Sequence, residues 1–415
     1  MSAQSVKSVT AQVTHQGLWS NLIGHDDVLP QLIRAARAAG GTLDEPSIAA
    51  MTHAWLFTGP PGSGRSVAAL ALAGALECVD AGCGTCSSCE LAAAGNHPDI
   101  EHVVPTAVMY RAEEVRALVA RAAMLPMLGS WRVIVVEDAD RLNESSANAL
   151  LKAIEEPAPR TVWMLCAPSA VDVLPTIASR CRLVHMGTPP VDVVAAELIR
   201  RYTVDESTAV WAARAAQGHV GRAAALVRDE HTRSRRASVM AIPGRLTDLV
   251  SCYQAATTVV ATAQADAAAV TTELDEREEQ AVLEAYGDGA TGKGLSAASV
   301  RARSELTRLK KQQESRARRV LRDEYDRVLL DLLGFYRDVW MSQSAVSAPL
   351  INTDMTDSVT RLADRSRAEE SVAKMDAITH AQSMLRANAA PLLVFESLFV
   401  QLWNPGATRL AVSPQ

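Results

Sequence analysis

The sequence predicts a parallel α/β module, followed by a small helical lid and an all-α C-terminal domain. Short apolar stretches alternate with amphipathic helical patterns over residues 1–187, and such alternation requires parallel strands joined by crossover helices. A glycine-rich turn joins the first of these strands to its helix. From residue 188 no further strand pattern occurs, so we expect the lid over 188–243 and the helical domain over 244–415.

The individual elements of the α/β module follow from the same patterns. We expect strands at 53–57, 100–105, 131–138 and 161–167, and helices at 28–39, 66–76, 111–124 and 144–156. Asn143 can cap the last of these helices, and Pro157 ends it.

Composition sets the class of protein. With 415 residues, the chain exceeds the usual size of a single core and should form two or three domains. The net charge is −6, from 41 basic and 47 acidic residues, so any contact with DNA must be local or made through partners. The polar stretch 1–17 lacks the features of a signal peptide, and no stretch suits a membrane span, so we expect a cytoplasmic protein.

The stretch Leu56–Ser66 matches the outline of a phosphate-binding loop. From Gly59 to Ser66 it fits Gly-x-x-x-x-Gly-Lys-Ser/Thr at every position except the lysine, which is Arg65. Arginine is a wider, planar fork that need not fit the slot between phosphates. The glycines let backbone N–H groups turn toward an anion, and the serine hydroxyl suits Mg²⁺. The predicted nucleotide-binding residues of this degenerate loop are Gly59, Gly62, Ser63, Gly64, Arg65 and Ser66.

The strand at 131–138 ends in two acids, Glu137 and Asp138. A buried parallel strand delivers such carboxylates to the carboxyl edge of the sheet, beside the loop. In phosphate-loop ATPases the order is aspartate, which holds the metal-bound water, then glutamate, which orients the attacking water. Here the order is reversed, so we expect ATP with Mg²⁺ to bind weakly or without hydrolysis.

Four cysteines follow the loop helix, at Cys78, Cys83, Cys86 and Cys89. Thiolates at this spacing can close a tetrahedron around Zn²⁺. A set of buried free thiols is the alternative, but the glycines and serines between the cysteines would make a poor core. No catalytic acid accompanies the cluster, so we interpret the zinc as structural.

Charges are sorted along the C-terminal region. Residues 273–279 are rich in acids, and residues 301–319, beyond the glycine-rich loop 287–294, are rich in bases. Opposite charges on the two sides of one turn predict an antiparallel helical hairpin with charge pairs between its helices. A DNA-facing strip on Arg301–Arg322 is the alternative. The interleaved acids, which weigh against that strip, are Glu305, Glu314, Asp323 and Glu324.

Taken together, the motifs resemble the bacterial clamp-loader ATPases of the AAA+ class, most like the delta-prime subunit of DNA polymerase III. The resemblance covers residues 18–230, and the segment 265–325 looks like an insertion. The motifs that support this resemblance are Gly24, Gly59–Ser66, the four cysteines, His97-Pro98-Asp99, Asn148–Lys152, Glu155-Glu156-Pro157 and Ser179-Arg180-Cys181.

This resemblance implies a stator subunit in an open ring of five, together with gamma/tau-type motor subunits and a delta subunit. The ring uses ATP to open the sliding clamp and place it on primed DNA. Arg180 would be an arginine finger for the neighbouring ATP site; an intrachain ion pair with Glu155 or Glu156 is the alternative. Pro168-Ser169 stands where active members carry threonine or asparagine, and Gly221 or Arg222 could align with the sensor-2 arginine.

Two further hypotheses about function remain open from the sequence. One is an active AAA+ motor subunit of the same complex, in which Arg65 substitutes for lysine. The other is a zinc-containing DNA-binding module, which would be expected to be basic.

Overall fold

The computed structural model describes residues 17–40, 50–105, 109–285, 295–344 and 349–404. The chain divides into two compact units, Met1–Arg228 and Asp229–Gln415, each of which is described by itself. The division into three parts at residues 187 and 243 stays a prediction. Among the described helices, none combines the length and apolar character that crossing a membrane demands.

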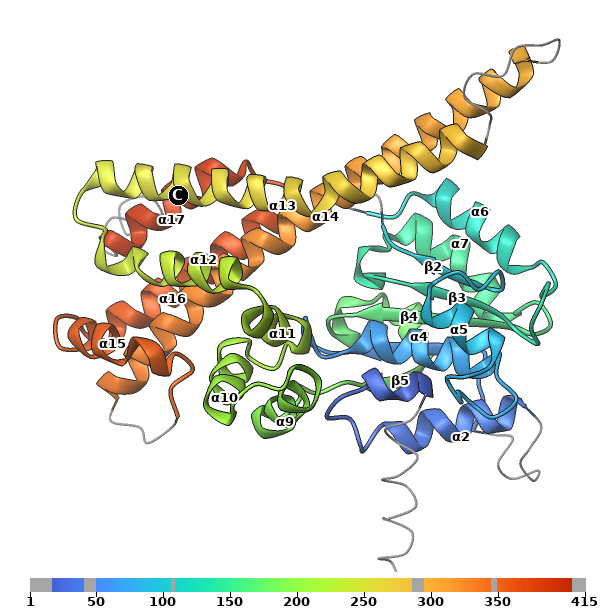
Figure 1. The fold of residues 1–415 in the computed structure, drawn as a ribbon, viewed down its shortest axis with the longest axis horizontal. Coiled ribbons are helices and arrows are strands. Elements are labelled where there is room, and N and C mark those ends of the chain that lie inside the picture. The colour runs from blue at the N-terminus through green and yellow to red at the C-terminus, as the bar shows by residue number, and fades with distance from the viewer. Residues whose placement is uncertain (1–16, 41–49, 106–108, 286–294, 345–348, 405–415) are drawn as a thin grey trace, which may run out of the picture. The chain divides into compact units, whose positions relative to one another are not determined.

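The first unit is built on a five-stranded parallel sheet (Figure 1). Its strand order is β2-β3-β4-β1-β5. The strands are β1 (Ala54–Thr58), β2 (Ile100–Val103), β3 (Arg132–Val136), β4 (Thr161–Ala167) and β5 (Arg182–His185). The sequence did not predict β5, because this short edge strand is only partly buried and lacks a continuous apolar run.

Helices cover both faces of the sheet, as is usual for parallel strands joined by crossover helices. One face carries Trp55, Phe57 and Met164 and packs against α2 (Leu29–Ala39) and α4 (Arg65–Leu76). On the other face, Leu56, Trp163 and Leu165 share a second core with the remaining helices. Those helices are α6 (Ala112–Ala122), α7 (Glu144–Glu155) and α8 (Pro175–Ala178). Successive residues of a strand point to opposite faces, so each strand serves both cores.

Shorter elements complete the first unit. The 3₁₀ helix η1 (Gly17–Asn21) and α5 (Ser87–Ala93) both lie against α4. Three further helices, α9 (Val191–Tyr202), α10 (Glu206–Ala215) and α11 (Val220–Arg228), pack around a small alanine-rich core of their own. This helical group follows the sheet and corresponds to the predicted lid.

The second unit is all helical in its described residues. Its helices are α12 (Glu230–Met240), α13 (Leu249–Ala285), α14 (Leu295–Gln343), α15 (Thr356–Ala363), α16 (Ala368–Arg386) and α17 (Pro391–Trp403). Tyr336, Phe395 and Phe399 are fully buried in its core. The outer halves of α13 and α14 extend beyond this core as a helical hairpin (Figure 1). The predicted parallel α/β module and helical C-terminal region are thereby confirmed, and the lid over 188–243 stays a prediction.

Candidate functional site

The glycine-rich loop joins β1 to α4 and is shaped by close backbone contacts. Gly64 is the N-cap of α4, with φ +87°. A Cβ added to Gly59 would lie 2.3 Å from the carbonyl oxygen of Met186, and one added to Gly62 would lie 2.4 Å from the ring of His219. No other residue fits at these two positions without a shift. The backbone cradle of a phosphate-binding loop is therefore preserved.

A buried hydroxyl in this loop bears on whether an anion fits there. The Oγ of Ser63 is buried and has no hydrogen-bond partner among the described residues. His25 donates from Nε2 to the Ser63 carbonyl oxygen at 2.6 Å, and burial lowers the pKa of this histidine, which keeps the ring neutral near pH 7. An unpartnered hydroxyl within a glycine cradle suits a phosphate oxygen. The loop thus retains features that fit a nucleotide.

The Arg65 side chain turns back onto its own loop. Its Nη1 donates to the carbonyl oxygen of Gly59 at 2.6 Å, and its Nη2 lies 3.9 Å from Oδ1 of Asp138. Asp138 also pairs with Arg141 at 3.4 Å and has a left-handed backbone with φ +47°. Two guanidinium groups therefore engage the second acid of the strand end.

Glu137 is engaged as well. The hydroxyl of Ser66 donates to Oε2 of Glu137 at 2.8 Å, and Nε2 of His102 lies 3.0 Å from Oε1. This brings together the two residues expected to flank Mg²⁺. Sequence reasoning missed His102, because a single histidine on the neighbouring strand β2 gives no signal of its partner. Burial, and then the charge of Asp138, raise the pKa of nearby Asp140.

The strand that follows in the sheet, β4, reaches the loop through its backbone. Gly59 N–H donates to the carbonyl oxygens of Ala167 at 3.3 Å and Pro168 at 3.1 Å. Ser169 uses its side chain to cap a short 3₁₀ turn, where it accepts a hydrogen bond from Val171 N–H. The position where active relatives are expected to carry a polar side chain therefore presents a main-chain carbonyl.

The four cysteines meet as the spacing predicted. Their Sγ atoms all lie within 4.8 Å of one another. The separations are 3.6 Å for Cys78–Cys83, 3.8 Å for Cys78–Cys86 and 4.0 Å for Cys83–Cys89. Sulfur atoms bound tetrahedrally to Zn²⁺ at about 2.3 Å lie about 3.8 Å apart. The donor set and its geometry fit a zinc ion.

Local backbone contacts hold this cluster. Gly84 packs against Gly17, where an added Cβ would lie 2.3 Å from its Cα, and Trp19 Nε1 donates to Ala81 at 2.9 Å. Hydrogen bonds from the backbone and hydroxyl of Thr85 lower the pKa of Cys83 to about 6. Because a metal binds the thiolate form of cysteine, the lowered pKa of Cys83 favours the form that a metal ion needs.

Arg180 lies on the surface just after α8. Its Nε is 2.5 Å from Oε1 of Glu155, and its Nη1 donates to the carbonyl oxygen of Thr176 at 2.9 Å. Both side chains of the ion pair are more than 40% exposed. The intrachain pair considered from the sequence therefore exists, and the guanidinium remains accessible to solvent. An exposed pair of this kind contributes little to stability.

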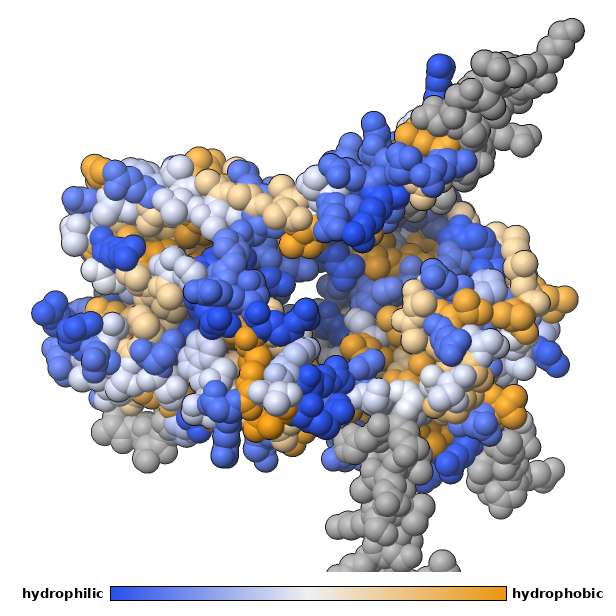
Figure 2. All heavy atoms as spheres, viewed as in Figure 1, coloured by the Kyte–Doolittle hydropathy of each residue, from blue (hydrophilic) through white to orange (hydrophobic). Residues whose placement is uncertain are grey.

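The structure also shows a loop that sequence reasoning missed, residues 123–131 between α6 and β3. Its exposed apolar side chains are Met124, Leu125, Met127 and Leu128. Figure 2 shows hydrophobic residues gathered at this end of the sheet. The carboxylate of Asp99 accepts three hydrogen bonds from the loop backbone, from the N–H groups of Met127, Leu128 and Gly129, at 2.6 to 2.8 Å. Nearly thirty residues separate donor and acceptor, so the sequence alone does not reveal this anchor.

Comparisons with known proteins locate the relationship in the first unit. A family model described as "DNA polymerase III, delta subunit" matches residues 46–190. The delta-prime subunit of DNA polymerase III from Pseudomonas aeruginosa is 39% identical over 135 residues, which cover 31% of this chain and 41% of that protein. The Escherichia coli subunit is 32% identical over 196 residues, or 46% of this chain and 59% of that protein.

Two further matches are to proteins named as gamma-type subunits. The gamma/tau subunit from Mycobacterium tuberculosis is 34% identical over 135 residues, which cover 31% of this chain and 23% of that protein. A gamma subunit-related protein from Thermotoga maritima is a structural neighbour at 16% identity and TM-score 0.35, over 84% of this chain and 93% of that one. The chain spans about half the length of the delta-prime relatives it matches. Over its α/β region, the chain is similar in sequence to the delta-prime subunits of DNA polymerase III.

Proposed function

We propose that this chain is a stator-type subunit of the replicative clamp loader and does not hydrolyse ATP itself. One observation carries the proposal: Arg65 and Glu137, the charged groups expected to serve hydrolysis, are already engaged by other groups of the same chain. Arg65 reaches Gly59 and Asp138, while Glu137 is bonded to Ser66 and His102. Phosphoryl transfer depends on a cation placed between the phosphates and a carboxylate placed to orient the nucleophile. Neither group is in such a position here.

Nucleotide binding is a separate matter from hydrolysis. The backbone cradle at Gly59, Gly62 and Gly64 and the unpartnered hydroxyl of Ser63 support weak binding of ATP with Mg²⁺. Bound Mg²⁺ would supply charge compensation for the phosphates, and Ser66 and Glu137 would hold it. In this proposal the site can still bind a nucleotide but no longer hydrolyses ATP.

The arginine finger is the active contribution of the proposed stator. Arg180 is exposed and would leave Glu155 to reach the ATP site of a neighbouring gamma/tau-type subunit. A guanidinium supplied in trans accelerates phosphoryl transfer by about 10³- to 10⁵-fold in well-studied cases. Exchange of one exposed ion pair for contact with a phosphoryl group therefore carries a large functional gain at little cost in stability.

Assembly is part of the same proposal. The partners would be motor subunits and a delta subunit in a pentameric ring, which acts on the sliding clamp and primed DNA in the cytoplasm. Exposed apolar side chains grouped on the anchored loop 123–131 support contact with another protein. The cysteine cluster would hold a structural zinc, residues 188–243 would serve as the lid, and residues 244–415 would form the collar of the ring.

ATP turnover by the chain alone and by the reconstituted complex tests this function. We expect no turnover above background for the isolated chain. In the complex, Arg180→Ala should lower turnover at the neighbouring ATP site by at least about 100-fold without loss of assembly. Arg200→Ala is the matched control, because Arg200 is also exposed and also pairs at 2.5 Å with a glutamate, Glu197. Turnover by the isolated chain at the rate of a motor subunit would establish the alternative, an active AAA+ ATPase.

A further inference from the structure

We propose that the outer face of α14 binds the phosphate backbone of a nucleic-acid duplex. This goes beyond the proposed function, because it concerns the helical hairpin and holds whether or not the loop binds ATP. We define the basic face as the exposed side chains described between residues 303 and 319. They are Arg303, Ser304, Thr307, Lys310, Lys311, Glu314, Arg318 and Arg319.

The charge of this face is strongly one-sided. Five cations and one acid give it a net charge of +4. The acid, Glu314, lies 3.4 Å from Arg318. For the other four cations, no ion pair is recorded within the described part of the chain. With a rise of 1.5 Å per residue, the face is about 24 Å long, which corresponds to about seven base pairs of a duplex.

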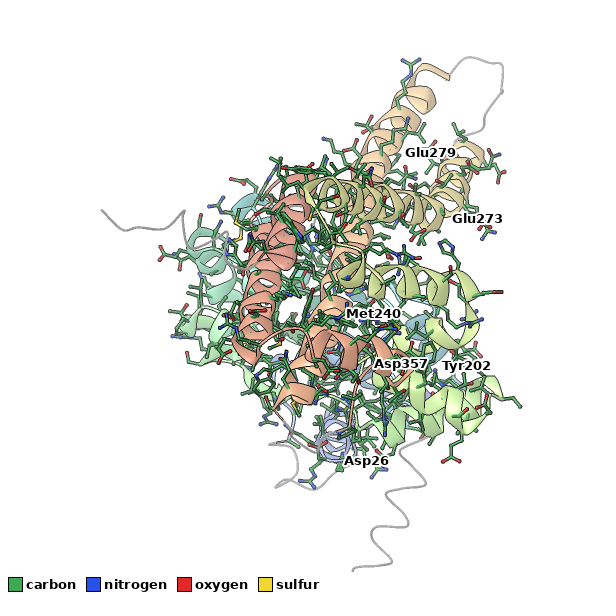
Figure 3. The ribbon with its side chains drawn as sticks, turned by 90° about the vertical axis from the view of Figure 1, so that its left-hand side faces the viewer. Asp26, Tyr202, Met240, Glu273, Glu279 and Asp357 are labelled. Carbon is green, nitrogen blue, oxygen red and sulfur yellow. The ribbon has the colours of Figure 1, made fainter. Side chains whose placement is uncertain are left out.

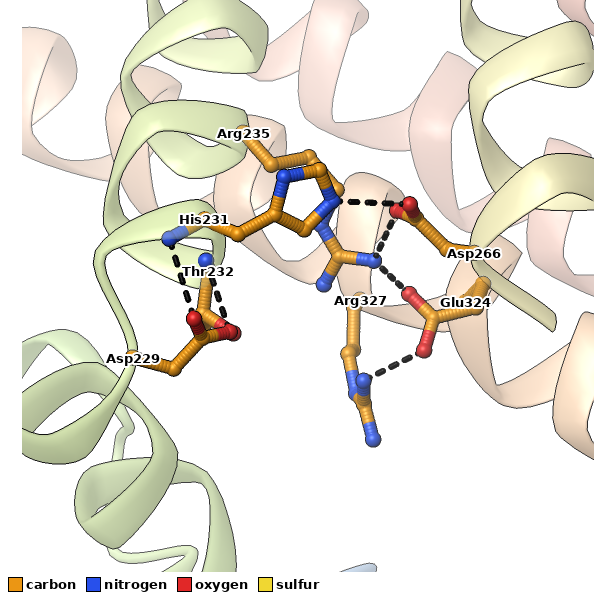
Figure 4. A network of polar contacts seen from close by, with 7 residues as sticks. All are labelled: Asp229, His231, Thr232, Arg235, Asp266, Glu324 and Arg327. Atoms are coloured by element: carbon orange, nitrogen blue, oxygen red, sulfur yellow. Dashed lines mark hydrogen bonds and ion pairs between the residues drawn. The ribbon is translucent and has the colours of Figure 1, made fainter. Parts of the chain in front are cut away.

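Two of the four acids that weighed against a DNA-facing strip are withdrawn from the basic face. Glu305 is half buried, and Asp323 lies beyond the basic face. Glu324 is buried, and Arg235 of α12 and Arg327 both pair with it (Figure 4). Folding therefore withdraws two of the four interleaved acids, Glu305 in part and Glu324 in full, whereas Asp323 stays exposed one helical turn beyond Arg319. The sequence pattern could not show this sorting.

The acidic helix α13 does not cancel the basic face either. Arg316 points to the inside of the hairpin, where it pairs with Asp275 and with Glu278, and these contacts raise the pKa of its guanidinium. Glu273, which Figure 3 labels on α13, pairs with Arg277 of the same helix. Among the described side chains, Arg316 thus forms ion pairs with α13 on the inner side of the hairpin, whereas the cations of the basic face point away from those contacts.

The chemistry of the basic face favours a phosphate backbone over a protein partner. In its described residues it exposes no large apolar side chain, whereas protein interfaces usually centre on such anchors. Figure 2 shows mostly hydrophilic side chains over the described part of the hairpin. The stretch 301–322 also contains no aromatic residue on which unpaired bases could stack. A duplex, recognised through its phosphates without regard to sequence, is the partner that fits.

The root of the hairpin is held firmly, so the basic face is presented on a fixed element. Arg235 links three helices, because it pairs with Asp266 of α13 at 2.9 Å and with Glu324 of α14 (Figure 4). His231, also on α12, reaches Asp266 at 2.8 Å. Cations carried on a helix whose base is pinned lose less conformational freedom on binding a duplex than cations on an unstructured segment.

Fluorescence anisotropy with the full chain and a labelled 30-base-pair DNA duplex tests the proposal. We expect micromolar binding whose salt dependence reports about three to four phosphate contacts. Lys311→Glu/Arg318→Glu should weaken binding at least tenfold and flatten the salt dependence. Arg277→Glu/Arg361→Glu is the matched control, since it changes the net charge equally at exposed arginines on α13 and α15 outside the basic face.

Each other outcome overturns the assignment. Equal weakening by the two double variants would mean that only net charge matters. Absence of duplex binding by the wild-type chain would exclude the interface directly. If poly-L-glutamate displaced the duplex as effectively per charge, the face would be a site for acidic proteins. Tighter binding to single-stranded DNA of the same length would exclude a duplex backbone as the preferred partner. None of these results depends on ATP turnover.

Discussion

The degenerate loop and the helical hairpin hold similar charged residues but arrange them differently. In the loop, Arg65, Glu137 and Asp138 lie within one pocket and engage one another or their immediate neighbours. In the hairpin, the contacts of α13 face inward, while most bases of α14 face outward. Charges that are paired in a pocket stabilise an architecture, whereas unpaired charges on a surface are available to a partner. Changes to the first region should therefore alter folding or chemistry, and changes to the second should alter binding alone.

The largest effect should come from the cysteine cluster, which lies close to the loop helix. We expect one tightly bound Zn²⁺ per chain, and Cys86→Ser should reduce the zinc content at least tenfold and unfold the cluster locally, because zinc binding is coupled to folding. Elemental analysis and limited proteolysis measure the two effects. Cys181→Ser is the control, since Cys181 is a free cysteine outside the cluster. Unchanged zinc in Cys86→Ser would show that the four thiols do not act together.

Asp99 should show the next largest effect, on stability. Asp99→Ala removes the acceptor of three backbone hydrogen bonds, and we expect the free energy of unfolding to fall by about 2–4 kcal/mol. Urea denaturation followed by tryptophan fluorescence measures this loss. Asp172→Ala is a suitable control, because Asp172 is an exposed acid in a short 3₁₀ turn. A loss below about 0.5 kcal/mol would mean that the loop 123–131 does not need its anchor.

The same residue predicts a pH dependence. Burial raises the pKa of Asp99, but its backbone hydrogen bonds outweigh this effect and hold the pKa below the usual 3.8. The folded state therefore favours the charged carboxylate, and this stabilisation is present above pH 3.8 and lost as the pH falls through the lowered value. Asp99→Asn should reduce the steepness of acid unfolding in that range. An identical acid profile for wild type and variant would contradict this assignment.

A conservative change in the loop should have almost no effect on hydrolysis. Arg65→Lys restores the expected residue, but Glu137 remains bonded to Ser66 and Asp138 still faces Arg141. We expect ATP turnover to stay within about threefold of background, as measured by phosphate release from the isolated chain. Robust turnover after this one substitution would show that the pocket is intact apart from its lysine.

The smallest effect should come from the hairpin. Arg318→Ala removes an exposed pair with Glu314, and such pairs contribute about 0–1 kcal/mol, so the free energy of unfolding should change by less than about 0.5 kcal/mol. Duplex binding should nevertheless weaken by several-fold in the same protein. A large loss of stability would mean that the outer cations hold the hairpin together, and it would erase the contrast between the two regions.

Features that depend on local pattern could be predicted from the sequence. Apolar runs predicted four of the five strands. The cysteine spacing predicted the cluster of four sulfur atoms, and the motif from Gly59 to Ser66 predicted the loop between β1 and α4. These predictions succeeded because each rests on residues that are close in the chain. The edge strand β5 was missed, since partial burial leaves no continuous apolar run.

Pairs between charges that lie far apart in the sequence became visible in the tertiary structure alone. Ser66 and Glu137 are 71 positions apart, Asp99 holds a loop nearly thirty residues away, and Arg235 meets Glu324 at a separation of 89. No spacing rule predicts such contacts, because they depend on which helix packs against which strand or helix. The same packing buried Glu324 and left Lys311 exposed, although a count of charges along the chain treats both as members of one mixed segment. What a charged side chain can do depends on its burial and on its partners, and both are set only when the chain folds.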